Sequence, residues 1–250
     1  MTAPTPVLVR VPVDGPCAAV FTTRIGGTSR GPYATLNLAA TVDDAPDDVR
    51  ANRQGLCRAV GIDPACVVVG TQVHGLRVRH VDEPSGKFLD PEYKWPEGDG
   101  LVSSLPGVGV GVFGADCLSV LLWRRDRPQV AAIHAGWRGL VDGILERAVR
   151  QMGGAEGIAA AIGPGIGPCC YPVSADVRDR FAARFGQSCL AGDAVDLVRA
   201  ARTALGGAGL PGSAVWAIET CTSCDGVRWF SFRRDGAPTG RQAGIIWPIA

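Results

Sequence analysis

The chain has 250 residues, of which 46% are hydrophobic, and its 25 basic against 24 acidic side chains give a formal net charge of +1 at pH 7. A chain of this length and composition can bury a full core, and we expect one domain spanning residues 1–250. The balanced charge, with no basic block, argues against nucleic acid and membrane surfaces as partners.

Short apolar, β-branched runs predict the strands of a buried sheet, with amphipathic helical segments between them. In chain order, the predicted strands are 66–69, 107–113, 120–122, 129–133, 158–162 and 215–218. The predicted helices are 47–60, 140–152 ending at Gly153-Gly154, a segment capped by Ser174 that runs to Phe185, and 193–205. The alternation indicates a layered α/β fold.

The first six residues, Met1 to Pro6, lack the charged start and apolar stretch of a secretion signal. No apolar run reaches the roughly eighteen residues that a membrane-spanning helix needs. The nine cysteines are an odd number spread along the chain, which suits a reducing compartment better than a disulfide framework. We therefore expect a cytoplasmic protein whose cysteines are mostly small buried apolar residues.

Two of the three histidines, and a cysteine between them, occur where predicted strands meet glycine turns. The residues are His74 in Gln72-Val73-His74-Gly75, Cys117 in Ala115-Asp116-Cys117, and His134 just before Gly136. Two imidazoles and one thiolate are a zinc-type ligand set, and three protein ligands leave the fourth tetrahedral position open. The spacings of 43 and 17 residues carry little information, so a metal site at one rim of a sheet and three ordinary core residues are both open interpretations.

Asp116 is the carboxylate nearest to this group in the sequence, and a deaminase needs a carboxylate that moves protons at the metal. Strand alternation would point Asp116 away from Cys117, so this role requires the preceding strand to end at Gly114. His80, the third histidine, is predicted to lie at the surface.

Two segments match known motifs by their letters alone. Gly109 to Gly114 matches G-x-G-x-x-G, but it lies in an apolar run and opens no helix, so we expect a glycine-rich strand. Cys221-Thr222-Ser223-Cys224 matches C-x-x-C, but no second pair with zinc-finger spacing follows. We expect neither a redox nor a structural-metal role for that pair.

Several arginines stand next to glycine turns, where guanidinium groups and exposed backbone amides suit a phosphate or carboxylate. For any single one of them, a solvated side chain that tethers a loop is the competing interpretation. They are Arg24, Arg138, Arg233, Arg234 and Arg241.

Together these segments resemble the bacterial laccase-domain family, whose members are regarded as zinc-dependent purine nucleoside phosphorylases and are also called multicopper polyphenol oxidases or peptidoglycan editing factors. The resemblance spans nearly the whole chain. Its marks are Thr23 to Gly27, Leu36-Asn37-Leu38, Asn52-Arg53, Gln72 to Gly75, Ala115 to Leu118, His134 to Gly139, Ile162-Gly163-Pro164, Cys169-Cys170-Tyr171, Cys221-Thr222 and Phe230 to Gly236.

The resemblance implies a single α/β domain similar to the catalytic domain of cytotoxic necrotizing factor, a Cys-His hydrolase. It implies phosphorolysis of inosine, adenosine, guanosine and methylthioadenosine, together with adenosine deamination. The implied cofactor is Zn²⁺, with copper as an alternative occupant, and the implied ligands are His74, Cys117 and His134. The implied catalytic residues are Cys117, His134 and Asp116, and the implied substrate-binding residues are Arg24, Arg53 and Arg138. We expect a small-molecule substrate and a monomer or weak homodimer.

Some positions depart from the family pattern, and none of them is an implied metal ligand. Such departures would change the choice of substrate or the reaction rate. They are Ser119, Gly165, Pro172, Ala201 and Ala204.

Three other functions compete with phosphorolysis. A copper-dependent polyphenol oxidase would need a trinuclear cluster built mainly from imidazoles, and the chain has three histidines. A peptidoglycan editing amidase would use Cys117 as nucleophile and His134 as base on a UDP-MurNAc-amino acid precursor. A non-enzymatic protein would hold a structural zinc and bind a partner.

Overall fold

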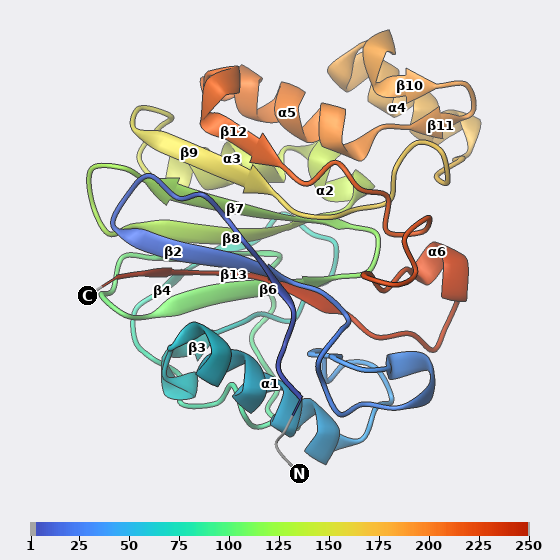
Figure 1. The fold of residues 1–250 in the computed structure, drawn as a ribbon. Helices are drawn as coiled ribbons and strands as arrows, with labels where there is room; N and C mark the ends of the chain where they lie inside the picture. Colours follow the sequence, from blue (N-terminus) through green and yellow to red (C-terminus); the bar gives the residue numbers. More distant parts are fainter. Residues whose placement is uncertain (1–3, 250) are drawn as a thin grey trace.

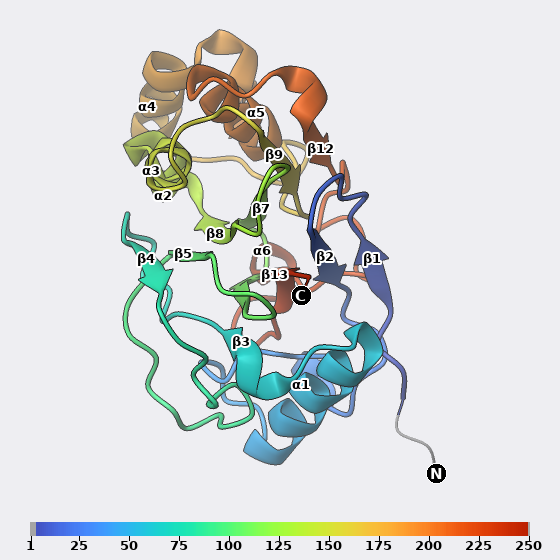
Figure 2. The same cartoon turned by 90° about the vertical axis from the view of Figure 1, so that its left-hand side faces the viewer.

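The structure is a computed structural model that describes residues 4–249. Residues 1–3, which belong to the segment expected to lack a secretion signal, and residue 250, the last of the expected domain, lie outside the described residues. Two sheets pack against each other, and helices cover their outer faces (Figures 1 and 2). In Figure 1, α2, α3, α4 and α5 lie above one sheet and α1 lies below the other. The expected layered α/β class is confirmed.

The two sheets differ in size and combine antiparallel with parallel pairs. The five-stranded sheet has the order β1 (Leu8–Arg10), β2 (Cys17–Thr22), β13 (Gln242–Pro248), β6 (Gly109–Gly114), β3 (Val67–Val68). The six-stranded sheet has the order β12 (Val215–Ala217), β9 (Ile158–Ile162), β7 (Leu118–Arg124), β8 (Val130–Ala135), β5 (Gly100–Ser103), β4 (Val78–Val81). A separate hairpin joins β10 (Leu190–Ala191) and β11 (Ala194–Val195).

Strand β7 shows why the central strands are apolar on both faces. Val120 and Leu122 pack into the core under the helices, whereas Leu121 and Trp123 pack into the core between the sheets. Successive side chains of a strand point to opposite faces, so a strand covered on both sides must be apolar at every position. This explains the continuous apolar runs that identify the central strands in the sequence.

The helices largely follow their predicted positions. They are α1 (Pro46–Val60), α2 (Trp137–Asp142), α3 (Ile144–Gln151), α4 (Ala175–Phe185), α5 (Leu197–Gly207) and α6 (Phe232–Asp235), with short 3-10 turns η1 (Gly31–Tyr33), η2 (Pro64–Cys66), η3 (Gln187–Cys189) and η4 (Gly212–Ala214). The predicted helix 140–152 is instead two helices, because Gly143 between them has a φ of 89°. The predicted start at residue 193 is also wrong, since β11 occupies residues 194–195 and Asp196 caps α5.

Strands β2, β4, β5 and β13 were not among the predicted elements. Strands β4 and β5 have four residues each, and β13 contains glycine and proline, which hides the β pattern. Strand β2 is apolar, but two of its six residues are alanines, which have a low β propensity. The glycine-rich segment Gly109 to Gly114 is strand β6, as expected. A Cβ on Gly109 would lie 2.9 Å from a side-chain carbon of Ile62, so glycine at this position admits close packing.

The expected exposure of His80 and the expected burial of most cysteines have opposite outcomes. His80 lies exposed on β4, as predicted. The expected burial of most cysteines is wrong, because only Cys17, Cys57 and Cys189 are buried among the nine. Among residues 4–249, none of the helices combines the length and the hydrophobicity that a transmembrane span needs.

The candidate site lies where the chain passes from one sheet to the other. Strand β6 of the five-stranded sheet ends at Gly114 and β7 of the six-stranded sheet begins at Leu118, so Cys117 lies in the crossover. His74 lies in the loop between β3 and β4, which also joins the two sheets. His134 is near the end of β8, opposite Ser119 of β7.

Candidate metal centre

The side chains of His74, Cys117 and His134 converge at this crossover. One nitrogen of each imidazole and the thiol sulfur all lie within 4.8 Å of one another. His74 Nε2 is 3.9 Å from Cys117 Sγ, and the two imidazole rings meet edge to face with centroids 4.8 Å apart. Tetrahedral zinc would place such donor atoms roughly 3.5 Å apart. The donor types and spacing therefore fit one metal ion with an open fourth position.

Asp99, which the sequence argument missed, organises the two histidines. Its buried carboxylate accepts hydrogen bonds from the backbone N–H groups of Val73, His74 and Gly75 at 3.1, 2.9 and 2.8 Å. The same carboxylate lies 2.8 Å from His134 Nδ1. A carboxylate on Nδ1 fixes the ring and directs Nε2 towards a metal.

His74 needs this support because its backbone has a φ of 59°, in the left-handed region that most non-glycine residues avoid. Three N–H groups aimed at one carboxylate hold the loop in that conformation. The sequence signal for Asp99 is weak, since it is an acidic residue between Gly98 and Gly100 at the start of a short strand.

The thiol and imidazole of Cys117 and His134 shift each other's protonation. Burial raises the pKa of Cys117, but hydrogen bonds and positive charge from His134 and His74 outweigh burial and lower the pKa to about 6. Burial lowers the pKa of His134, but Asp99 and Cys117 outweigh it and raise the pKa to about 9. In the metal-free protein, a thiolate beside an imidazolium is thus favoured at neutral pH.

Asp116 lies in the crossover with a φ of 97°. The strand before it does end at Gly114, as a catalytic role requires. Its two carboxylate oxygens, however, accept hydrogen bonds of 2.6 Å from the Thr222 hydroxyl and the Arg233 backbone N–H. Asp116 therefore anchors two C-terminal loops to the crossover.

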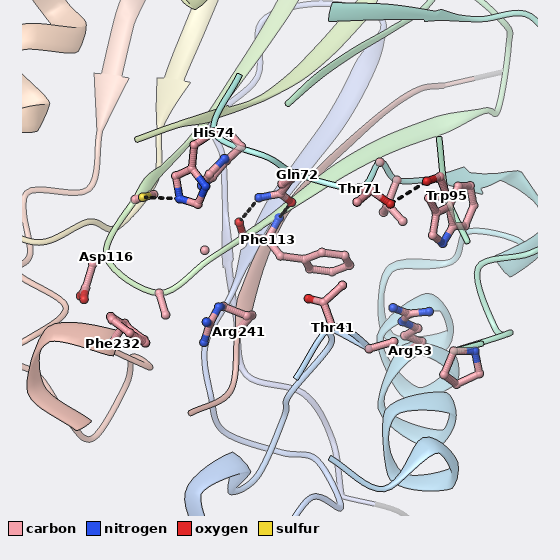
Figure 3. A pocket seen from close by; sticks show the side chains of 18 of the residues that line it. Thr41, Arg53, Thr71, Gln72, His74, Trp95, Phe113, Asp116, Phe232 and Arg241 are labelled. Atoms are coloured by element: carbon pink, nitrogen blue, oxygen red, sulfur yellow. Dashed lines mark hydrogen bonds between the residues drawn. The ribbon is translucent and has the colours of Figure 1, made fainter. Parts of the chain in front are cut away.

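A cavity of about 650 Å³ opens in front of the three ligands. Figure 3 shows His74 at one end, Trp95 and Arg53 at the other, and Phe113 and Arg241 between them. The volume lies within the range of small-molecule sites, and aromatic walls with a few charged groups are typical of them. Gly165, Pro172, Ala201 and Ala204, which depart from the family pattern, do not line the cavity.

The three arginines predicted to bind substrate have different surroundings. Arg53 lines the cavity, but it is buried and donates to the backbone carbonyls of Leu38 and Phe88 at 2.9 and 2.7 Å. Burial lowers the pKa of Arg53 to about 10. Arg24 donates to the carbonyls of Ala34 and Gly226 and lies over Phe230, outside the cavity lining.

Arg138 lies over the Trp137 ring and is also absent from the cavity lining. Two other arginines beside glycine turns line the cavity instead, namely Arg233 and Arg241. Arg241 Nη1 donates to the carbonyls of Thr239 and Gly240 at 2.8 and 2.9 Å, which fixes its guanidinium in the cavity (Figure 3). Burial lowers the pKa of Arg241, while the charges of Cys117 and Asp116 oppose that shift.

Comparison with known proteins is consistent with this geometry. The family model described as multi-copper polyphenol oxidoreductase laccase matches residues 18–249. The purine nucleoside phosphorylase YfiH of Escherichia coli strain K12 is 39% identical over 93% of this chain and 94% of its own length. The purine nucleoside phosphorylase of Deinococcus radiodurans is 39% identical over 98% of this chain and 94% of its own length.

Solved structures show the same architecture. The crystal structure of YlmD from Geobacillus stearothermophilus superposes with a TM-score of 0.86 at 32% identity, covering 96% of this chain and 94% of that one. The crystal structure of Bacillus licheniformis YfiH superposes with a TM-score of 0.87 at 30% identity, covering 92% of each chain. The chain therefore belongs to the multi-copper polyphenol oxidoreductase laccase family.

Proposed function

We propose that the protein is a purine nucleoside phosphorylase, which converts a purine nucleoside and phosphate into the free base and ribose-1-phosphate. The observation that carries the proposal is the cavity, in which a three-donor metal ligand set and the guanidinium of Arg241 line the same space. Relatives at 35–39% identity over most of the chain are named purine nucleoside phosphorylases. Inosine, adenosine, guanosine and methylthioadenosine are the proposed nucleosides.

The proposed metal is zinc, held by His74, Cys117 and His134. When bound, it would supply a Lewis acid at its open coordination position. Asp99 keeps the His134 ring oriented through Nδ1. Copper is the alternative occupant, and metal analysis of protein purified without added copper decides between them.

The walls of the cavity suit the two substrates. Trp95 and Phe113 offer aromatic faces for a purine, and Arg241 and Arg233 offer guanidinium groups for phosphate. We propose Arg241 and Arg233 for phosphate in preference to Arg24 and Arg138, because the first two line the cavity. Tyr171 also lines the cavity, and because burial raises its pKa to about 12, its hydroxyl stays protonated at neutral pH and can donate a hydrogen bond to a bound substrate.

Adenosine deamination at the same metal is the weaker part of the proposal. A deaminase needs a carboxylate that reaches the reacting water. Asp116 instead accepts hydrogen bonds from Thr222 and Arg233. The geometry thus favours phosphorolysis.

Amide hydrolysis is a second candidate function, and one observation favours it. Asp99 is hydrogen-bonded to His134, and a ring nitrogen of His134 lies within 4.8 Å of the Cys117 sulfur, so the three could act as an orienting acid, a base and a nucleophilic thiol, as in Cys-His hydrolases. This is the arrangement that the expected similarity to cytotoxic necrotizing factor would require. One thiolate cannot bind zinc and attack an amide at the same time, so metal removal separates the two functions.

The test is incubation of zinc-loaded protein with inosine and phosphate, with the products separated by chromatography. Hypoxanthine and ribose-1-phosphate are expected, and both should disappear when phosphate is omitted. The matched control is His80→Ala, which removes an exposed histidine away from the cavity and should keep full activity. If the zinc-loaded protein forms no product while the metal-free protein releases an amino acid from a UDP-MurNAc precursor, the amidase is correct.

A further inference from the structure

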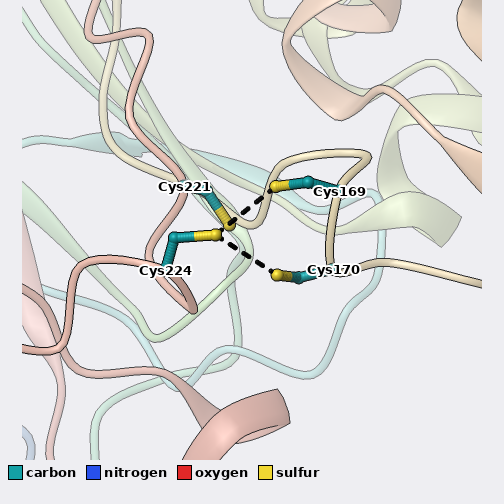
Figure 4. Close-up of side chains that lie close together, drawn as sticks. All are labelled: Cys169, Cys170, Cys221 and Cys224. Atoms are coloured by element: carbon teal, nitrogen blue, oxygen red, sulfur yellow. Dashed lines mark hydrogen bonds between the residues drawn. The ribbon is translucent and has the colours of Figure 1, made fainter.

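A second group of metal-binding side chains lies outside the cavity. Four thiols converge there, with all sulfur atoms within 4.8 Å of one another (Figure 4), and they belong to Cys169, Cys170, Cys221 and Cys224. Cys224 Sγ lies 3.5 Å from Cys169 Sγ and 3.4 Å from Cys170 Sγ. A tetrahedral zinc with bonds of about 2.3 Å would place its sulfurs roughly 3.8 Å apart. The four thiols thus have nearly the spacing that one ion requires.

Two loops supply these thiols in pairs. The first follows β9 and carries the adjacent pair, while the second follows β12 and carries the C-x-x-C pair. The loops are joined by a hydrogen bond of 2.9 Å from the Thr222 backbone N–H to the Gly165 carbonyl. The adjacent pair lacks zinc-finger spacing, so the sequence alone does not connect it with the C-x-x-C pair.

The backbone around Cys221 is arranged for a thiolate. The N–H of Gly167 donates to Cys221 Sγ at 3.2 Å. A Cβ at Gly167 would lie 3.1 Å from Cys221 Cβ and 3.4 Å from Cys169 Sγ, so only glycine brings this backbone so close to both sulfurs without displacing them. An N–H pointing at sulfur stabilises its negative charge.

Neither core packing nor disulfide formation accounts for the cluster as it stands. Cys169 and Cys224 are exposed, so the group is not a buried apolar contact. The sulfur atoms of Cys224 and its neighbours are 3.4 Å or more apart, against about 2.05 Å in a disulfide. A single disulfide would also leave two of the four thiols unused.

We propose that Cys169, Cys170, Cys221 and Cys224 bind one zinc ion in a closed, structural site. Four thiols lose their protons to solvent and bind one Zn²⁺, which gives the centre a formal charge of −2. Thiolates in a tetrahedral set select zinc or iron over harder divalent cations. The site is distinct from the cavity ligands and does not depend on the proposed enzymatic function.

The position of the cluster gives this zinc a structural consequence. Tyr171, which lines the cavity, directly follows Cys170. Arg234 donates from Nη1 to the carbonyls of Thr222 and Ser223, and Arg233 donates to the carbonyl of Pro172. An ion that joins the two cysteine loops therefore holds together the loops that form one wall of the cavity.

Metal analysis of the full-length wild type and four full-length variants tests the proposal. His74→Ala, which removes a cavity ligand, should retain one zinc per chain, and the double variant His74→Ala with Cys224→Ser should retain none. Cys66→Ser is the matched control, since it changes a partly exposed thiol outside the cluster and should leave the zinc content of the wild type. Cys224→Ser should melt at a lower temperature than the Cys66→Ser control.

A second measurement does not require any variant to fold. Cobalt added to metal-free wild-type protein should give the intense thiolate-to-cobalt absorption of a four-thiolate site, which the single thiolate of the cavity site cannot produce. Zinc content that Cys224→Ser leaves unchanged, iron in place of zinc, a cobalt spectrum with one thiolate, or disulfides among these cysteines in the freshly purified protein would each overturn the proposal.

Discussion

The two cysteine-containing clusters of this molecule differ in donor number, support and surroundings. His74, Cys117 and His134 offer three donors at a crossover between two sheets, and their loop is held by the buried carboxylate of Asp99. The four-cysteine cluster offers four donors from two surface loops. Three supported donors facing a cavity leave room for a substrate, whereas four donors saturate a tetrahedral ion. Donor number and rigid support therefore favour a chemical role for the first cluster and a stabilising role for the second.

The largest expected effect follows from removing a ligand of the first cluster. His134→Ala should lower kcat/KM for inosine by at least about 10³-fold, because a metal supplies several kcal/mol of transition-state stabilisation. It should also lower the zinc content by one ion per chain. Steady-state kinetics and metal analysis, with His80→Ala as control, measure both. Full activity in His134→Ala would show that the first cluster is not the catalytic centre.

Removing the support that Asp99 gives to His74 and His134, while keeping all three metal ligands, should have an intermediate effect on zinc binding. Asp99→Asn keeps the size of the side chain but cannot accept all the hydrogen bonds that the carboxylate now accepts. We expect a 10- to 100-fold weaker zinc affinity, the usual cost of losing a partner of a ligating histidine. Competition with a coloured chelator measures this affinity, and Asp126→Asn at the surface is the control. An unchanged affinity would mean that ligand placement does not depend on Asp99.

A smaller and more selective effect is expected at the arginine in the cavity. Arg241→Gln removes a charged donor, worth about 1.5–3 kcal/mol, and should raise the KM for phosphate by roughly 10- to 100-fold. The KM for inosine should change much less. Arg138→Gln, outside the cavity lining, is the matched control. If Arg138→Gln has the larger effect on phosphate, the arginine assignment is reversed.

The smallest perturbation is a change of pH in the metal-free protein. The pKa of Cys117 is lowered to about 6, so iodoacetamide should label it at pH 7 and more slowly as the pH falls through 6. Burial raises the pKa of Cys17 and Cys57 to about 12, so both should stay unlabelled at pH 7. Peptide mass spectrometry measures each site, and added zinc should protect Cys117. Labelling of Cys117 that sets in only above pH 8 would contradict the proposed electrostatics.

The ligand types and the central strands could be predicted from the sequence, whereas features that depend on contacts between distant residues could not. The runs that form β7, β8 and β9 are apolar at consecutive positions, which is a local property of the sequence. Asp99 contacts His74 across 25 residues, and its role depends on a loop conformation that no local pattern encodes.

The arginines of the cavity and the four-cysteine cluster are likewise defined by contacts between residues that are distant in the sequence. Arg24 and Arg241 both stand beside glycine turns, yet only the fold shows that one is tied to backbone carbonyls away from the cavity while the other lines it. The two cysteine pairs lie about fifty residues apart and meet only because β9 and β12 are neighbours in one sheet.

If His74, Cys117 and His134 form an open catalytic metal site, cleavage of inosine must depend on the metal. Phosphate-dependent cleavage of inosine, followed as the metal is removed by a chelator and zinc is added back, tests it most directly. Hypoxanthine formation should be lost with the metal and restored by zinc, and it should require phosphate throughout. Undiminished phosphate-dependent cleavage in the fully metal-free protein would show that this cluster is not a catalytic metal site.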